Sequence, residues 1–211
     1  MPRVRLLLIS VGLVLIIVSG LPAAGYPFDW SVIDHRVQKD ESGIWNPKVY
    51  RGLVGALSVA GLGGALWEGS ETRLGKTLWQ TMDSELLAAG STTALKYVFT
   101  RVRPSETSDP NEWFAHGSND SFPSTEAAFS ASLVTPFVLE YAGEHPAAYG
   151  LLVLPLYVGI GRVKNQAHWQ SDVLAGWAIG GLSGWYAHRR ETPILVQVFP
   201  HGVFVGIKTR F

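Results

Sequence analysis

The sequence predicts an all-α protein, a compact bundle of about six helices followed by a short C-terminal β-hairpin. Apolar, alanine- and leucine-rich stretches with three-to-four spacing recur along the chain, separated by polar or glycine-rich joints, at residues 52–67, 127–139, 147–161 and 173–187. Near the C-terminus this pattern changes to β-prone runs. The 211 residues suffice for one domain with a full core, so we expect a single site.

Residues 1–25 have the pattern of a targeting segment. Two arginines within residues 1–5 precede an apolar run at 6–21, and Ala23, Ala24 and Gly25 are small residues at which a signal peptidase would cut. The run is slightly long for a signal peptide and slightly short for a spanning helix, so a cleaved signal and an N-terminal anchor are both open. We expect export to the periplasm or cell envelope.

The helical domain is expected at residues 26–190, with short mixed elements at 26–50 that pack across the helices. Each apolar stretch falls short of the roughly 20 residues that cross a bilayer, and the helix expected at 82–98 carries charged and hydroxyl side chains. A soluble or peripherally attached protein is therefore favoured. An integral inner-membrane protein with a periplasm-facing site is the alternative, because its helix order would be the same.

Two further segments differ from the helices in composition. Residues 104–123 are rich in Ser, Asp, Asn, Gly and Pro and predict a surface loop of about 20 residues, longer than most connections, at the mouth of a site. Residues 194–199 and 203–208 are β-prone and are joined through a Pro-His-Gly turn. They predict a hairpin within a C-terminal appendage at residues 191–211.

Charge and cysteine content exclude several classes of function. Lys plus Arg and Asp plus Glu number 17 each, which gives no reason to expect a nucleic acid partner. The chain has no cysteine, so disulfide scaffolds, thiolate metal sites and cysteine nucleophiles are ruled out.

A first motif places two cations seven positions apart at the end of a predicted helix. Lys96 and Arg103 precede Pro104, which helps to stop the helix, and two helical turns would bring both cations to one side. Arginine can bind phosphate oxygens in a bidentate fork and lysine adds a point charge, so the pair can hold an oxyanion.

A second motif, residues 121–126, leads into an alanine-rich helix. Ser124 and Thr125 lie where a helix would begin, and the free backbone N–H groups of a helix N-terminus bind anions. Ordinary capping is the simpler interpretation of this serine, and Glu126 suits a first turn because the helix dipole favours an acid there.

A third motif contains Arg162, His168 and Asp172. If the chain is helical from Ala167 onwards, His168 and Asp172 lie one turn apart, and the carboxylate can accept a hydrogen bond from one ring nitrogen and leave the other free. An imidazole held in this way is set up as a nucleophile.

Together, the three motifs resemble the type 2 phosphatidic acid phosphatase (PAP2) superfamily. Its signature is lysine, six residues, arginine and proline; then Pro-Ser-x-His; then arginine, five residues, histidine, three residues and aspartate. The first and third spacings are complete here, and Pro123 and Ser124 fit the second. Two positions differ: Gly161 stands where the family usually has serine, and Glu126 stands where it has histidine.

The resemblance implies a PAP2-like helical phosphatase domain, with His168 as the nucleophile that forms a phosphohistidine and Asp172 as the residue that orients it. It implies that the phosphate is bound by Lys96, Arg103, Ser124, Thr125 and Arg162, without a metal or other cofactor. Glu126 occupies the general-acid position. Cations and the helix N-terminus should keep it ionised and unable to donate a proton, so His116 in the loop is a substitute candidate.

The function expected is hydrolysis of a phosphomonoester or lipid (pyro)phosphate in the bacterial envelope, in association with a membrane. A catalytically impaired protein that binds phosphate or lipid head groups is the main alternative, and vanadate-dependent halide oxidation is a third. Four aromatic residues near the motifs suit either an apolar lip for a lipid tail or core packing, namely Trp113, Phe114, Phe122 and Trp169. The oligomeric state is not specified by the sequence.

Overall fold

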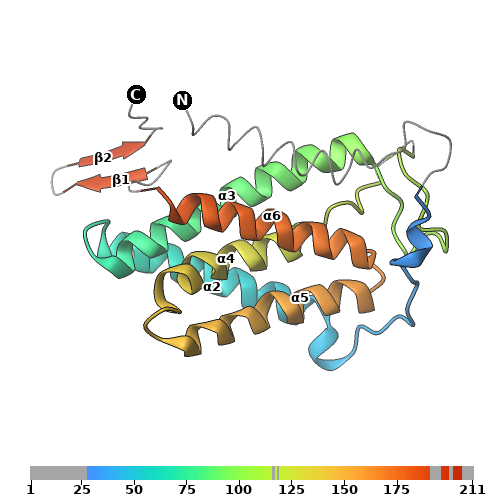
Figure 1. The fold of residues 1–211 in the computed structure, drawn as a ribbon, viewed down its shortest axis with the longest axis horizontal. Helices are drawn as coiled ribbons and strands as arrows, with labels where there is room; N and C mark the ends of the chain where they lie inside the picture. Colours follow the sequence, from blue (N-terminus) through green and yellow to red (C-terminus); the bar gives the residue numbers. More distant parts are fainter. Residues whose placement is uncertain (1–27, 116, 118, 191–195, 200–201, 206–211) are drawn as a thin grey trace.

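The computed structural model describes residues 28–115, 117, 119–190, 196–199 and 202–205. Within these ranges the domain is helical, as predicted, and its α-helices are α2 (Pro47–Glu68), α3 (Arg73–Phe99), α4 (Thr125–Tyr141), α5 (Val153–Lys164) and α6 (Gln170–His188) (Figure 1). Three short 3-10 helices accompany them, η1 (Trp30–Val32), η2 (Gly43–Trp45) and η3 (Pro146–Leu152), the last of which runs directly into α5. The described part therefore holds five α-helices, and the predicted targeting segment at 1–25 lies outside it.

Two short strands, β1 (Val196–Phe199) and β2 (Gly202–Val205), pair antiparallel, with Val196 opposite Val205 and Phe199 opposite Gly202. The residues between them and the rest of the 191–211 appendage lie outside the described ranges. The complete hairpin, and its packing on the bundle, therefore stay predictions.

Side-chain caps set the starts of the long helices. Asn46 accepts a hydrogen bond from Lys48 N with Pro47 as the first helical residue, Thr72 accepts from Gly75 N, and Ser124 accepts from Ala127 N. Such caps satisfy backbone donors that the helix itself leaves unpaired.

Helix α3 lies within the bundle and buries an unusual number of polar side chains. The hydroxyls of Thr77, Thr81 and Thr92 donate to carbonyls one turn back, and Ser84 donates to the carbonyl of Ser132 on α4. These bonds within and between helices satisfy groups that would otherwise be costly to bury.

Close packing of α4 against α6 brings two motif segments together. A Cβ atom on Gly176 of α6 would lie 2.5 Å from the carbonyl oxygen of Ser124, so glycine is needed for the helices to approach. This contact sets the N-terminus of α4 beside the first turn of α6, where Asp172 lies.

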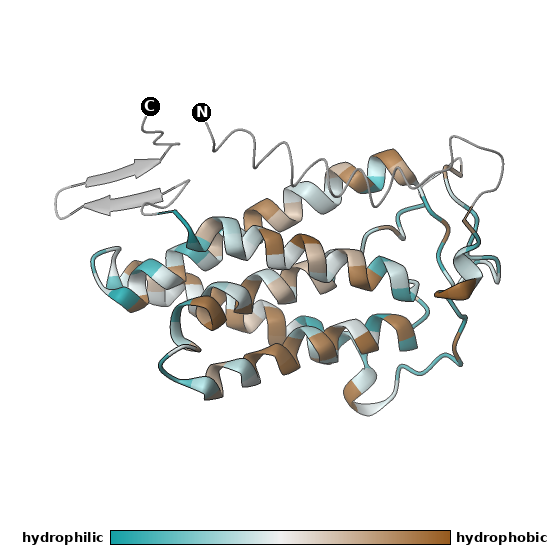
Figure 2. Ribbon diagram, viewed as in Figure 1, coloured by the Kyte–Doolittle hydropathy of each residue, from teal (hydrophilic) through white to brown (hydrophobic). Residues whose placement is uncertain are grey.

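Two segments are long and apolar enough to cross a membrane by length and composition, α2 with 22 residues and Pro146–Lys164 with 19. The prediction that every apolar stretch falls short of this length was wrong, because α2 also takes in the polar turn at its N-terminus and η3 extends α5 without a break. Only 17% of the apolar window of the first and 28% of that of the second are buried. Figure 2 shows η3 and α5 as largely hydrophobic.

Candidate functional site

The three motif segments meet at one end of the bundle, where the chain leaves α3, enters α4 and passes from α5 to α6 (Figure 1). Residues 28–46 cross the same end and are tied to it by hydrogen bonds, among them Gln166 to the carbonyl of Val37 and Asn165 to that of Asp40. This segment, which the sequence analysis expected to pack across the helices, therefore holds the α5–α6 loop in place.

His168 lies in that loop and is buried, with 1% of its surface exposed. Its Nδ1 is 2.5 Å from the backbone oxygen of Ser121, which can only accept a hydrogen bond, so Nδ1 carries the proton. Its Nε2 is buried without a hydrogen-bond partner among the described residues. The unprotonated nitrogen is therefore the free one.

The ring is neutral near pH 7. Burial lowers the pKa of His168 to about 3, an effect that Arg162 and Lys96 reinforce and the nearby Glu126 carboxylate only partly opposes. A neutral imidazole with a free lone pair is the form in which histidine can act as a nucleophile.

Asp172 makes no hydrogen bond to the ring. Helix α6 begins at Gln170, not at Ala167 as expected, and Asp172 Oδ2 lies 3.9 Å from His168 Nδ1. The carboxylate instead accepts from Ser121 Oγ at 2.6 Å and from Trp169 N at 2.9 Å. The prediction of a direct His168–Asp172 hydrogen bond was wrong: Asp172 holds Ser121, and the carbonyl of Ser121 holds the ring.

Sequence reasoning missed the residue that pairs with Asp172. Arg101, fully buried, donates from Nη1 to Asp172 and from Nη2 to Asp34, at 2.6 Å in both cases. Asp34 also accepts from the backbone N and the hydroxyl of Ser171. The only signal in the sequence was the position of Arg101 inside the first motif, between Lys96 and Arg103. Nothing in the mixed segment at 26–50 marked Asp34.

Lys96 and Arg103 meet, as expected, but not on one helix. Helix α3 ends at Phe99, where Thr100 is left-handed with a φ of 33°, so Arg103 lies on extended chain and Pro104 is not what stops the helix. Both cations hold Asp120: Lys96 Nζ donates to its backbone oxygen, and Arg103 Nε lies 2.8 Å from its carboxylate. Burial lowers the pKa of Lys96 to about 8.

Asp120 was also missed by sequence reasoning, because it lies in the long polar loop among many similar residues. The loop brings it to the cations together with Ser121, whose carbonyl holds His168. The predicted role of residues 104–123 at the mouth of the site is thus supported by position, with Asp120 as the side chain involved. His116 lies outside the described residues.

Glu126 stands in front of the free ring nitrogen, its Oε2 3.7 Å from His168 Nε2. Its Oε1 lies 3.1 Å from Nη1 of Arg162 and 2.8 Å from Nη2 of Arg51, a cation that sequence reasoning did not single out. Burial would raise the pKa of Glu126, but the Arg162 guanidinium beside it holds that pKa well below its ordinary value. The carboxylate is ionised, as the sequence predicted.

Gly161 allows Tyr50 to reach Arg162. A Cβ at Gly161 would lie 3.0 Å from the Tyr50 ring, closer than ordinary packing allows. The Tyr50 hydroxyl donates to Asn165 at 2.6 Å and accepts from Arg162 Nη1 at 3.2 Å. The hydroxyl expected from a serine at position 161 is therefore replaced by one from α2.

The other predicted residues have mainly structural contacts. Ser124 is buried and caps α4, and its backbone N–H donates to the carbonyl of Asp172, while Thr125 is the first residue of α4. Phe122 and Trp169 are buried, and Trp113 packs on Phe122 with ring centroids 5.1 Å apart. Phe122 and Trp169 thus belong to the core, Trp113 is partly buried, and Phe114 is half exposed.

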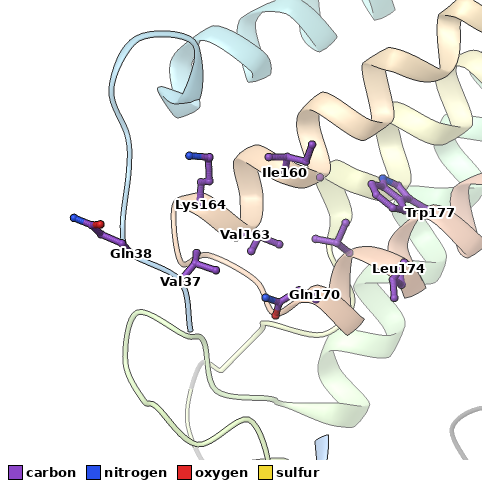
Figure 3. A pocket seen from close by; sticks show the side chains of 10 residues that line it. Val37, Gln38, Ile160, Val163, Lys164, Gln170, Leu174 and Trp177 are labelled. Atoms are coloured by element: carbon purple, nitrogen blue, oxygen red, sulfur yellow. The ribbon is translucent and has the colours of Figure 1, made fainter. Parts of the chain in front are cut away.

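A groove of about 610 Å³ lies elsewhere, between α5, α6 and the segment that carries Val37 and Gln38. Figure 3 shows its apolar floor, with Lys164 and Gln170 among the polar side chains that line it. None of the predicted site residues lines it. The described residues also include no group of three His, Asp or Glu side chains placed to hold a metal ion.

At one end of a helical bundle the structure thus places a buried neutral histidine with a free nitrogen among lysine and arginine side chains. The chain belongs to the PAP2 superfamily, whose family model matches residues 78–193.

Among curated proteins, the chain is 34% identical over 134 residues to Lipid A 1-phosphatase of Porphyromonas gingivalis, an alignment that covers 63% of this chain and 27% of that protein. The chain thus spans about a quarter of the length of this relative. Among solved structures, Aquifex aeolicus LpxE aligns with a TM-score of 0.47 and 16% identity, covering 69% of this chain and 88% of that one.

Proposed function

We propose that this chain is a phosphatase that removes phosphate from a phosphorylated lipid in the bacterial envelope, with His168 as the nucleophile. The observation that carries the proposal is the buried, neutral imidazole whose Nε2 has no partner among the described residues, beside the Glu126–Arg162 pair. The curated relative is named for a lipid phosphatase activity, which supports a lipid as the substrate class.

In the proposed reaction the lone pair of His168 Nε2 forms a bond to phosphorus while the bond from phosphorus to the leaving oxygen breaks, and that oxygen takes up a proton from solvent water. Water then attacks the phosphohistidine, the N–P bond breaks, and inorganic phosphate leaves with the imidazole restored. Asp172 would hold Ser121 and, through the Ser121 carbonyl, keep the proton on Nδ1.

The charge balance of the site favours a phosphate monoester. Four cations, Lys96, Arg103, Arg162 and Arg51, face the two carboxylates of Asp120 and Glu126. Two positive charges are left, which matches a dianion and stabilises charge on the phosphoryl oxygens during transfer. We propose that the substrate phosphate displaces both carboxylates from these cations.

Glu126 occupies the position from which the leaving oxygen would be protonated. A general acid is typically worth about 10²–10⁴ in rate, and an ionised carboxylate has no proton to donate. The site should therefore prefer substrates whose leaving oxygen is stable without prior protonation. In the second step the same carboxylate is placed to accept a proton from the attacking water.

Release of inorganic phosphate from an aryl phosphate tests the proposal. His168→Ala should abolish release, while His145→Ala, which changes an exposed histidine far from the motifs, should leave it unchanged. Equal rates for the wild type and His168→Ala would refute the nucleophile.

A catalytically silent phosphate-binding protein is the second candidate, because Glu126 pairs with the cations that a phosphate would need. Glu126→His separates the two. A gain of about 10²-fold or more in turnover from an inactive wild type supports the silent protein, whereas an active wild type that gains little supports the phosphatase.

We also propose that the protein works at the membrane of the envelope. Outward-facing leucines and valines line α2 and the η3–α5 segment, whose low burial suits contact with lipid. Peripheral attachment and integral insertion both agree with this, and residues 1–25 would supply export. Carbonate extraction of membranes and sequencing of the mature N-terminus would separate these cases.

A further inference from the structure

A second groove, of about 410 Å³, begins at the proposed phosphate site and runs along α2. At one end it is lined by Arg51 and Glu126, which pair at the site, and by Thr125. The rest of the lining is apolar except for Ser58, and consists of Tyr50, Val54, Gly55, Ser58, Val59, Phe129 and Val158. Its volume lies within the range of about 300–1,000 Å³ typical of small-molecule sites. The groove is therefore continuous with the site through residues that belong to both.

We infer that this groove between α2, α4 and α5 binds one acyl chain of the lipid whose phosphate lies at His168. This inference rests on the proposed function for the identity of the ligand. Arg51 stands where the two parts join, paired with Glu126 and half exposed. A phosphate that displaced Glu126 from Arg51 would leave the tail at the entrance of the apolar part.

The length of the groove fits part of an acyl chain. From Arg51 to Val59 the helix rises about 12 Å, at about 1.5 Å per residue. An extended chain advances about 1.2 Å per bond, as in an extended peptide, so the groove takes about ten methylenes. Each buried methylene should tighten binding about fourfold until the groove is filled.

Gly55 provides a direct way to block the groove. A Cβ at this position meets no atom within 4 Å, so a larger side chain would project into open space. Leucine has a higher helix propensity than glycine, so Gly55→Leu should keep α2 intact. Gly63 is a matched control: it lies on the same helix, is exposed, also has open space at Cβ, and does not line the groove.

The kinetic test compares 4-alkylphenyl phosphates, whose phenolate leaving oxygen needs no prior protonation, with alkyl chains of four and ten carbons in detergent micelles. In the wild type kcat/KM should rise by at least tenfold from the shorter to the longer substrate. Gly55→Leu should reduce this ratio to about one, and Gly63→Leu should keep it. An unchanged ratio in Gly55→Leu, or an equal loss in Gly63→Leu, would overturn the inference.

A binding test separates the groove from catalysis. Phosphatidic acid with a photoreactive acyl chain should label residues of the groove, and phosphatidylcholine with the same chain should label them much less. Labelling without any phosphate release would refute the phosphatase and keep the groove. Equal labelling by both lipids, or labelling confined to the groove that contains Val37 and Trp177, would refute the acyl site.

Discussion

The two sides of His168 are built from the same kinds of residue and differ in burial. Behind the ring, Arg101 joins Asp34 and Asp172, and all three side chains are fully buried and hydrogen-bonded. In front of it, the carboxylates are within reach of solvent: the Asp120 side chain is 48% exposed and that of Glu126 is 27% exposed. Two buried nitrogens in front, His168 Nε2 and Arg162 Nε, have no partner among the described residues.

This difference separates a scaffold from a binding surface. We call Arg101, Asp34 and Asp172 the rear network. Removing one partner from a buried ion pair leaves an uncompensated charge, so these three residues are held in a single arrangement. Water and salt can replace the partners of a partly exposed pair at little cost. Phosphate can therefore compete for the front cations without disturbing the residues that hold the ring.

The largest effect is expected from Arg101→Met, which leaves Asp34 and Asp172 buried without their cation. The free energy of unfolding should fall by about 3–5 kcal/mol. Urea denaturation followed by tryptophan fluorescence would measure the loss. A loss below about 1 kcal/mol would mean that the rear network is not a scaffold.

Asp34→Asn weakens the same network at its edge and should cost about 1.5–3 kcal/mol, the usual contribution of a hydrogen bond to a charged group. Asp34 has no contact with the ring, so KM should stay constant. The value of kcat should fall, because Asp172 becomes more mobile. A change confined to KM would contradict this positioning role. Stability and steady-state kinetics on the same preparation give both values.

Lys96→Arg tests the front side through pH. Lys96 carries its charge below its pKa of about 8 and loses it above, and the charged groups that act on it are Asp120, Arg103, Glu126 and Asp172. Sulfate keeps the same charge over this range. Its affinity should be highest at low pH, where Lys96 is fully protonated, and should fall about tenfold from one pH unit below that pKa to one unit above it. Arginine stays protonated, so the variant should show a flat profile. Matching profiles would contradict the assignment.

The smallest change in stability is expected for Arg51→Met, the front counterpart of Arg101→Met. Arg51 is 54% exposed, and a pair of this kind contributes about 0–1 kcal/mol. Phosphate affinity should nevertheless fall, because one of the four cations is lost. Comparing the two arginine variants by the same denaturation experiment shows whether stability and binding are separated as the structure indicates.

Spacing along the chain was sufficient to find the residues on the front side. Lys96, Arg103, Arg162 and His168 stand at intervals that identify them as a group, and Glu126 was predicted to be ionised from its position in a first helical turn near cations. Their catalytic and binding roles stay proposals. The helical class of the domain and the loop that carries Asp120 also followed from composition.

The rear network could not be predicted in this way. Asp34 is 138 positions before Asp172 and shares no motif with it, and the Arg101 between them forms both ion pairs only after α3 has ended at Phe99. The prediction of a direct hydrogen bond between Asp172 and His168 was wrong for a related reason. It assumed that the helix began at Ala167, whereas α6 begins three residues later.

The sequence by itself determined which residue types are present at which intervals, and therefore the helices, the family resemblance and the group of cations around His168. Only the tertiary structure decided which carboxylate forms an ion pair with which cation, that Tyr50 supplies the hydroxyl beside Gly161, and that a groove continues from the site along α2. The physical reason is that periodicity and spacing are local properties, whereas pairing between buried charges depends on which segments the packing of α4 on α6 and the crossing of residues 28–46 bring together.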